Sequence, residues 1–174
     1  MRSNFSKCIE LVLNSEGGYT NDAEDSGGPT NYGITHIDLA AWRGCPVTAN
    51  DVRKMKLSEA KAIYRAKYWD AVKGDDLPKG VDYAVFDFGV NSGISRSAKY
   101  VQRIVGVAAD GIIGPVTLAA IQKYDPALLI NQLLDRREEF LSAIIANNPS
   151  QAVFRKGWFR RTKEVRAAAL AMLA

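Results

Sequence analysis

Glu16 is the residue whose type and position are best suited to acid chemistry. It ends a stripe of apolar residues at steps of four, three and four: Phe5, Ile9 and Val12. This spacing puts Glu16 on the apolar face of a helix, at the negative end of the helix dipole. Partial desolvation and the helix end both favour a carboxyl that keeps its proton. Such a glutamate can act as a general acid, for example toward a glycosidic oxygen.

Candidates for a second catalytic group follow directly, at Asp25 and Thr30. Gly27 and Gly28 lie between them, and glycines allow the chain to turn back and a bulky ligand to approach the backbone. We therefore expect the loop to bring Asp25 and Thr30 toward Glu16. The residues alone leave a second interpretation open, in which Glu16 is an exposed helix-terminal residue and Asp25 forms a turn.

Metal chemistry is not indicated by this sequence. The segment from Asp22 begins like a calcium-binding loop, but Pro29 interrupts it and Gly33 stands where a bidentate glutamate is needed. Cys8 and Cys45 lack the spacing of a zinc site, and we expect two separate thiols rather than a disulfide. We expect no cofactor.

The elements that must position these residues are mainly helical. Hydrophobic periodicity, caps and prolines predict helices over residues 4–15, 35–43, 58–72, 78–93, 95–105, 115–124, 126–146 and 152–173. Ser58 is expected to cap the helix over 58–72, and Asp125 with Pro126 marks the start of the helix over 126–146. The helix over 78–93 is apolar all round and should be buried on most sides. No segment alternates with period two, so at most a small β-hairpin near residues 19–35 is expected.

Length and charge narrow the classes of function. The 174 residues suffice for one well-buried core, and no apolar run reaches the length of about 18 residues that spans a membrane. Residues 1–90 carry 11 Lys and Arg against 13 Asp and Glu, whereas residues 91–174 carry 12 against 6. Basic residues gather near the end of the sequence: Arg155, Lys156, Arg160, Arg161, Lys163 and Arg166. This cluster is compatible with binding to a polyanion or with a solvated helix face. No nucleic-acid-binding motif accompanies it.

Four motifs stand out in the sequence: EGGY at residues 16–19, the DSGGPTNYGIT stretch at 25–35 behind it, DFGVNSG at 87–93 and the DGIIGPVT stretch at 110–117. Together they resemble glycoside hydrolase family 108, the bacterial and phage N-acetylmuramidases, most strongly in the first two motifs. The resemblance covers about residues 4–170. The resemblance implies a lysozyme-like, mainly α, two-lobed fold. It also implies a lysozyme-like catalytic part over residues 1–90 and a peptidoglycan-binding region over 91–174, packed into one compact domain.

The resemblance implies hydrolysis of the β-1,4 bond between N-acetylmuramic acid and N-acetylglucosamine, with Glu16 as the catalytic acid. Asp25 and Thr30 would assist it, although they stand one residue closer together than the matching pair of phage-type lysozymes. For substrate binding we expect Tyr32 and Trp69 to stack on sugars and Asn91 to bond an N-acetyl group. Each has a structural alternative, as a core aromatic residue or a helix-terminal asparagine.

Peptidoglycan is the expected partner, with anionic wall polymers as a further possibility for the basic cluster. The N-terminus does not resemble a signal peptide, so we expect synthesis in the cytoplasm and release to the periplasm or cell wall, for example through a holin. This is the behaviour of an endolysin. Two alternatives remain open at this point: a non-catalytic peptidoglycan-binding module and a secretion-associated regulator. We expect neither membrane insertion nor nucleic-acid binding.

Overall fold

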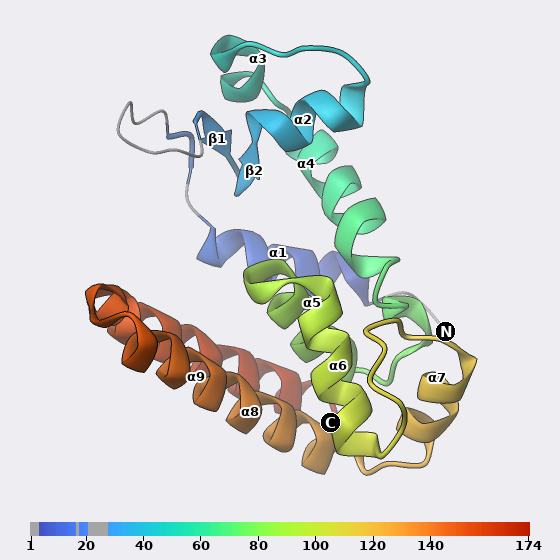
Figure 1. Cartoon of the computed structure of the whole chain (residues 1–174). Coiled ribbons are helices and arrows are strands. Elements are labelled where there is room, and N and C mark those ends of the chain that lie inside the picture. Colours follow the sequence, from blue (N-terminus) through green and yellow to red (C-terminus); the bar gives the residue numbers. More distant parts are fainter. Residues whose placement is uncertain (1–3, 17, 21–27) are drawn as a thin grey trace. The chain divides into compact units, whose positions relative to one another are not determined.

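A computed structural model describes residues 4–16, 18–20 and 28–174 of the chain (Figure 1). Over these residues it is mainly α, with nine α-helices and one two-stranded antiparallel sheet, which confirms the predicted fold class. No helix in the described part is both long enough and apolar enough to cross a membrane. Cys8 is buried and Cys45 exposed, and no disulfide joins them.

The described chain forms two compact units. The N-terminal unit is Phe5–Lys67, and the C-terminal unit is Tyr68–Ala174 together with Asn4. Asn4 belongs to the latter because its side-chain amide donates to the carboxylate of the buried Asp82, at 3.2 Å. The units therefore divide the chain earlier than the predicted parts 1–90 and 91–174, and a single compact domain stays a prediction.

Four helices and the hairpin make up the N-terminal unit. In chain order they are α1 (Phe5–Ser15), β1 (Thr30–Asn31), β2 (Ile34–Thr35), α2 (His36–Arg43), α3 (Ala49–Arg53) and α4 (Leu57–Tyr64). The hairpin lies within the region expected for it, between residues 19 and 35. Helix α3 was not predicted because five residues are too few to show periodicity. Its start is nevertheless marked by a capping box, in which Thr48 and Asp51 bond each other's backbone N–H.

The helix predicted over 58–72 differs in the structure. Helix α4 begins at Leu57 after Lys56 and has no side-chain cap, so Ser58 does not cap it. After Tyr64 the chain continues as a π-helical turn, Arg65–Trp69, and a 3₁₀ turn follows at Gly74–Asp76. Local spacing did not reveal this change because a π-helical turn has no distinct apolar period in so short a segment.

Five helices make up the C-terminal unit (Figure 1). They are α5 (Val81–Ser92), α6 (Ile94–Val105), α7 (Pro115–Gln122), α8 (Pro126–Asn147) and α9 (Arg155–Ala171). A 3₁₀ segment, Pro149–Phe154, joins α8 to α9, and these two helices lie side by side. Asp125 caps α8 as predicted, because its carboxylate accepts from the Leu128 N–H at 2.7 Å.

Helix α5 is the centre of this unit. Every residue from Val81 to Gly89 is buried, as its uniformly apolar pattern predicted, and the helix packs against α6, α8 and α9. Its one deeply buried acid facing α8 and α9 is Asp87, whose carboxylate lies 2.6 Å from Arg137 and 2.9 Å from Arg161. Burial alone would raise the pKa of Asp87, but the two guanidinium groups outweigh it and hold the pKa below its ordinary value.

We predict that Asp87→Asn destabilises the protein by about 3–5 kcal/mol, because it leaves the buried Arg137 without its anion. The depressed pKa adds a pH signature. The ionised Asp87 carboxylate contributes to the free energy of unfolding at pH values above about 3.9, the pKa of this group in the unfolded chain. This contribution is lost as the pH falls through the lower pKa that Asp87 has in the folded protein. The free energy of unfolding, measured with urea between pH 2 and 7, should therefore fall less with decreasing pH in the variant than in the parent protein.

Asp135→Asn is the matched control, because Asp135 pairs with Arg166 on the surface at 2.8 Å and is largely exposed. An exposed pair contributes at most about 1 kcal/mol, so this variant should stay close to the parent protein. Equal losses in the two variants would contradict the role assigned to the buried pair.

Candidate active site

Glu16 lies where the helical spacing predicts, at the C-terminal end of α1. Its backbone N–H donates to the carbonyls of Val12 and Leu13, both at 3.2 Å, so the helical turn extends to it. Val12 is buried on the same stripe, and the Glu16 residue is half-buried whereas Ser15 before it is exposed. The apolar face of α1 thus positions the carboxyl group at the edge of the core. Its role in catalysis stays a prediction at this point.

The turn of the hairpin faces this carboxyl group. Tyr32 and Gly33 link β1 to β2, and both have positive φ, 52° and 74°. Two residues with positive φ form the type I′ turn that suits the twist of a tight hairpin. The register pairs Thr30 with Thr35 and Asn31 with Ile34. The TNYGIT segment therefore folds into a hairpin with Gly33 at its tip.

Gly33 lies against both Glu16 and Tyr64. A Cβ atom at this position would fall 2.8 Å from Glu16 Oε2 and 2.6 Å from Tyr64 Oη, closer than either oxygen allows. The Tyr64 hydroxyl also donates to the Tyr32 carbonyl at 2.9 Å. A carboxyl group from α1, a phenol from α4 and the turn of the hairpin consequently meet at one place. The absence of a side chain on Gly33 makes this meeting possible.

Neighbouring contacts hold the hairpin in position. The buried Asn31 donates its side-chain amide to the carbonyls of Val52 and Arg53, at 3.0 and 3.3 Å, which ties β1 to α3. Thr35 caps α2, since its hydroxyl accepts from the Asp38 N–H at 3.1 Å. Both ends of the turn are bonded in this way, and the backbone of Gly33 between them lies against the Glu16 carboxyl.

Thr30 belongs to the same hairpin. Its backbone N–H and carbonyl each bond with Thr20 at 2.9 Å, and the two hydroxyl oxygens are 2.6 Å apart. Tyr19, the last residue of EGGY, stacks under the guanidinium of Arg53 at 4.7 Å. The segment after Glu16 is thus attached to the hairpin through Thr20. Asp25 lies outside the described residues, so its distance from Glu16 is not defined by the structure.

The predicted substrate-binding residues fall in different surroundings. Tyr32 is half-buried in the turn, beside Glu16 in the N-terminal unit. Asn91 is exposed near the end of α5, in the C-terminal unit. Their roles remain predictions.

Trp69 requires a correction. It is 0% exposed, its ring packs edge-on against Phe86 at 5.3 Å, and its indole N–H donates to Asp75 at 2.9 Å. A side chain with no exposed face cannot stack on a sugar, so Trp69 is a core residue of the C-terminal unit. The sequence could not separate the two roles because an aromatic residue at helical spacing is compatible with both.

Gly33 and Tyr64 are the site residues that sequence reasoning missed in this role. The pair Tyr32-Gly33 between short β-prone segments is a turn signal, but it does not say what the turn will contact. Tyr64 lies at helical spacing, which is compatible with sugar stacking and with core packing, but this spacing does not predict that its hydroxyl reaches the hairpin. Within residues 4–16, 18–20 and 28–174, no group of three or more His, Cys, Asp or Glu side chains gathers as a metal site would require.

Comparison with known proteins gives two matches that divide the chain between residues 93 and 96, later than the boundary of the two compact units. Residues 9–93, which include Glu16 and the hairpin, match the family model described as Glycosyl hydrolase 108. Residues 96–163 match the one described as Predicted Peptidoglycan domain. A solved structure titled "Structure of Brucella abortus SagA" is 42% identical, with a TM-score of 0.86, over 99% of this chain and 97% of that one. No curated protein matches.

The two family matches, in a mainly α fold, identify a glycoside hydrolase with a lytic role at the cell wall. The chain belongs to the glycosyl hydrolase 108 family. The resemblance of the EGGY segment to that family is thereby confirmed, and peptidoglycan is its substrate or partner.

We predict that Gly33→Ala impairs both folding and activity. The added methyl group would strain a residue with φ of 74° by about 1–2 kcal/mol and would also displace the Glu16 carboxyl and the Tyr64 hydroxyl. Displacement of a catalytic group by about 1 Å can cost on the order of 100-fold in rate. Urea unfolding and loss of turbidity of a peptidoglycan suspension measure the two effects.

Gly44→Ala is the matched control. Gly44 also has a positive φ, 68°, but a Cβ there would meet nothing within 4 Å. It should show the backbone cost of about 1–2 kcal/mol without the loss of activity. If the two variants lose equal stability and both keep full activity, Gly33 does not position Glu16.

Proposed function

We propose that the protein is an N-acetylmuramidase of the lysozyme type, which hydrolyses the β-1,4 bond between N-acetylmuramic acid and N-acetylglucosamine. The observation that carries this proposal is the position of the Glu16 carboxyl group. It is half-buried at the end of α1 and faces a hairpin turn that is fixed by Tyr64, Asn31 and Thr35. Glu16 also lies inside the segment that matches the glycoside hydrolase family.

In this mechanism Glu16 donates its proton to the glycosidic oxygen as the bond to the anomeric carbon breaks. The departing sugar leaves as an alcohol, and positive charge develops on the ring that remains. Water then adds to the anomeric carbon, and its proton is taken up by a carboxylate or by solvent. The hairpin that lies against the Glu16 carboxyl is held by the side chains of Asn31 and Thr35, so the acid lies beside a backbone of defined position.

We propose Asp25 as the group that stabilises the developing charge or activates the water, with Thr30 positioning that water. Thr30 lies two residues before Tyr32 on the same hairpin, which supports a place near Glu16. For Tyr32 we propose contact with the substrate. For Asn91 we propose a bond to an N-acetyl group. The protein would then act at the periplasmic or wall side after release from the cytoplasm, as an endolysin does.

Glu16→Gln tests the acid directly, because it preserves the shape of the side chain but removes the proton that titrates. We expect the rate of reducing-end release from purified sacculi to fall by about 10²–10⁴-fold while the unfolding transition stays unchanged. Glu10→Gln is the control, since Glu10 lies on the exposed part of α1. Near-normal lysis by the Glu16→Gln variant would falsify the assignment. Mass analysis of the products completes the test, because anhydro ends would indicate a transglycosylase instead.

Asp25→Asn tests the second group. If Asp25 stabilises charge or activates water, the variant should lose about 10²-fold or more in rate with little change in KM, because the carboxylate acts in the transition state. Asp22→Asn changes the charge of the same segment and should retain activity. A rate loss shared by both variants would show that only the charge of the segment matters, and would remove Asp25 from the mechanism.

A further inference from the structure

The positive charge that the sequence concentrates in the C-terminal cluster is partly paired with acids. Arg161 bonds Asp87 at 2.9 Å, Arg166 bonds Asp135 at 2.8 Å, and Arg160 lies 3.8 Å from Glu164. Half of the six cations of that cluster therefore have acidic partners. The remaining three, Arg155, Lys156 and Lys163, are exposed on α9.

A second set of cations lies on α6 and has no such partners in the described part of the chain. Among the residues that the structure describes, none of Arg96, Lys99 and Arg103 forms an ion pair. Arg96 and Arg103 are seven residues apart, which is two turns and about 10 Å along a helix. They therefore lie nearly in line on one face of α6, and no described acid lies within ion-pair distance of either.

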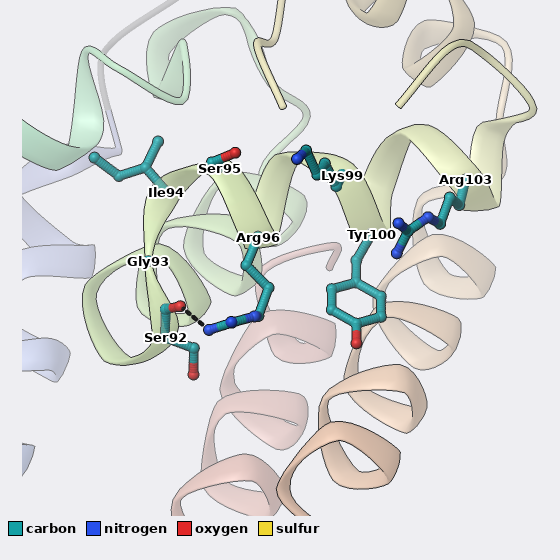
Figure 2. Close-up of a pocket in the computed structure, with 8 residues that line it drawn as sticks. All are labelled: Ser92, Gly93, Ile94, Ser95, Arg96, Lys99, Tyr100 and Arg103. Carbon is teal, nitrogen blue, oxygen red and sulfur yellow. Dashed lines mark hydrogen bonds between the residues drawn. The ribbon is translucent and has the colours of Figure 1, made fainter. Parts of the chain in front are cut away.

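These side chains line a pocket of 480 Å³ that runs along α6 from Ser92 to Arg103 (Figure 2). Figure 2 shows Arg96 and Tyr100 projecting from one side of the helix, with Arg103 at the far end and Lys99 at the opposite edge. A neighbouring pocket of 320 Å³ shares Tyr100 and Arg103 and continues to α8. Glu139, the acid that lines it, is bonded by Arg136 at 3.1 Å.

Aromatic rings hold the two arginines of this pocket. The Arg96 guanidinium lies 4.3 Å from the centroid of Phe140, and its Nη1 donates to the Ser92 carbonyl at 2.7 Å. Arg103 lies 5.6 Å from the centroid of Tyr100, which itself stacks on the buried Phe88 at 5.5 Å. A guanidinium carries five N–H donors, so Arg96 retains several for a ligand. Stacking also reduces the freedom that each side chain would lose on binding.

We propose that the groove formed by Arg96, Lys99, Tyr100 and Arg103, here called the α6 groove, binds the free carboxylates of peptidoglycan stem peptides. A guanidinium fork fits a carboxylate through two parallel N–H···O bonds. Two arginines about 10 Å apart along α6 match a peptide with several acidic groups better than they match a single small anion. The inference rests on the proposed function to the extent that the substrate is peptidoglycan.

Carboxylates are favoured over the phosphates of other wall polymers by the place of the groove in the chain. All four residues fall within 96–163, the segment that matches the Predicted Peptidoglycan domain. Stem peptides are attached to the muramic acid units of the substrate itself, whereas phosphate polymers are separate additions to some walls. Binding a stem would keep the glycan strand close to the enzyme between cleavage events.

The test compares two triple variants that remove the same charge from the same unit. The α6 variant removes the three cations of the α6 groove by the substitutions Arg96→Gln, Lys99→Gln and Arg103→Gln. The α9 variant removes the three exposed cations of α9 by the substitutions Arg155→Gln, Lys156→Gln and Lys163→Gln. Both are made in the Glu16→Gln background so that the ligand is not consumed. Binding to purified sacculi freed of attached proteins and wall polymers is measured by co-sedimentation. Binding to the soluble glycan strands from which an amidase has removed the stems is measured by titration calorimetry.

We expect the α6 variant to bind sacculi about tenfold more weakly, since each exposed ion pair contributes modestly and three are lost. The α9 variant should bind sacculi like the parent. On stem-free strands the α6 variant and the parent should bind alike. Binding by the parent should also weaken as salt rises, more steeply than in the α6 variant.

Three results would overturn the proposal. Equal weakening by the α9 variant would show that net charge alone matters. A loss on stem-free strands as large as on sacculi would show that the groove contacts sugar. Stronger α6-dependent binding to sacculi that retain phosphate polymers than to stripped sacculi would assign it to phosphate. The binding measurements do not depend on catalysis. The muramidase assignment is tested separately, by analysis of the products that the active enzyme releases.

Discussion

The hairpin turn lies against the end of α1 at Gly33, a residue without a side chain. Its backbone lies so near the Glu16 carboxyl and the Tyr64 hydroxyl that a single methyl group would overlap both. Glycine is suited to this position for a second reason, since the type I′ turn requires a positive φ there. One residue thus satisfies the geometry of the turn and the space requirement of the acid. The other contacts of the site, from Asn31 to α3 and from Thr35 to α2, hold that turn in place.

The C-terminal unit depends on a different interaction. Asp87 brings an anion into the centre of the most buried helix, and arginines from α8 and α9 compensate it there. An ion pair of this kind need not add net stability compared with an apolar core. It does make the packing of three helices specific, because any other alignment of α8 or α9 would leave a charge buried alone. This requirement takes one cation of the basic C-terminal cluster, Arg161, into the core.

Sequence reasoning found those parts of the molecule that local patterns encode. The stripe from Phe5 to Val12 predicted the placement of Glu16, and Asp125 and Pro126 predicted the start of α8. It failed where the outcome depends on distant partners. Trp69 could not be recognised as a core residue without Phe86 and Asp75, and the contact of Gly33 with Tyr64 joins residues far apart in the chain. The sequence likewise does not show which arginines form ion pairs. The structure is needed to see that Arg96 and Arg103 pair with no described acid.

The position of Arg161 shows where the peptidoglycan-binding part of the chain can be cut without loss of its core. The match to the peptidoglycan domain ends at residue 163, within α9, yet Val165 and Ala169 beyond it are buried and Arg161 holds the charge of Asp87. A chain shortened at the edge of that match would lose apolar contacts of the core, and one shortened before α9 would also leave Asp87 with one of its two cations. Helix α9 is therefore not a detachable tail, and exchanges of wall-binding segments between related enzymes should transfer α5, α8 and α9 together.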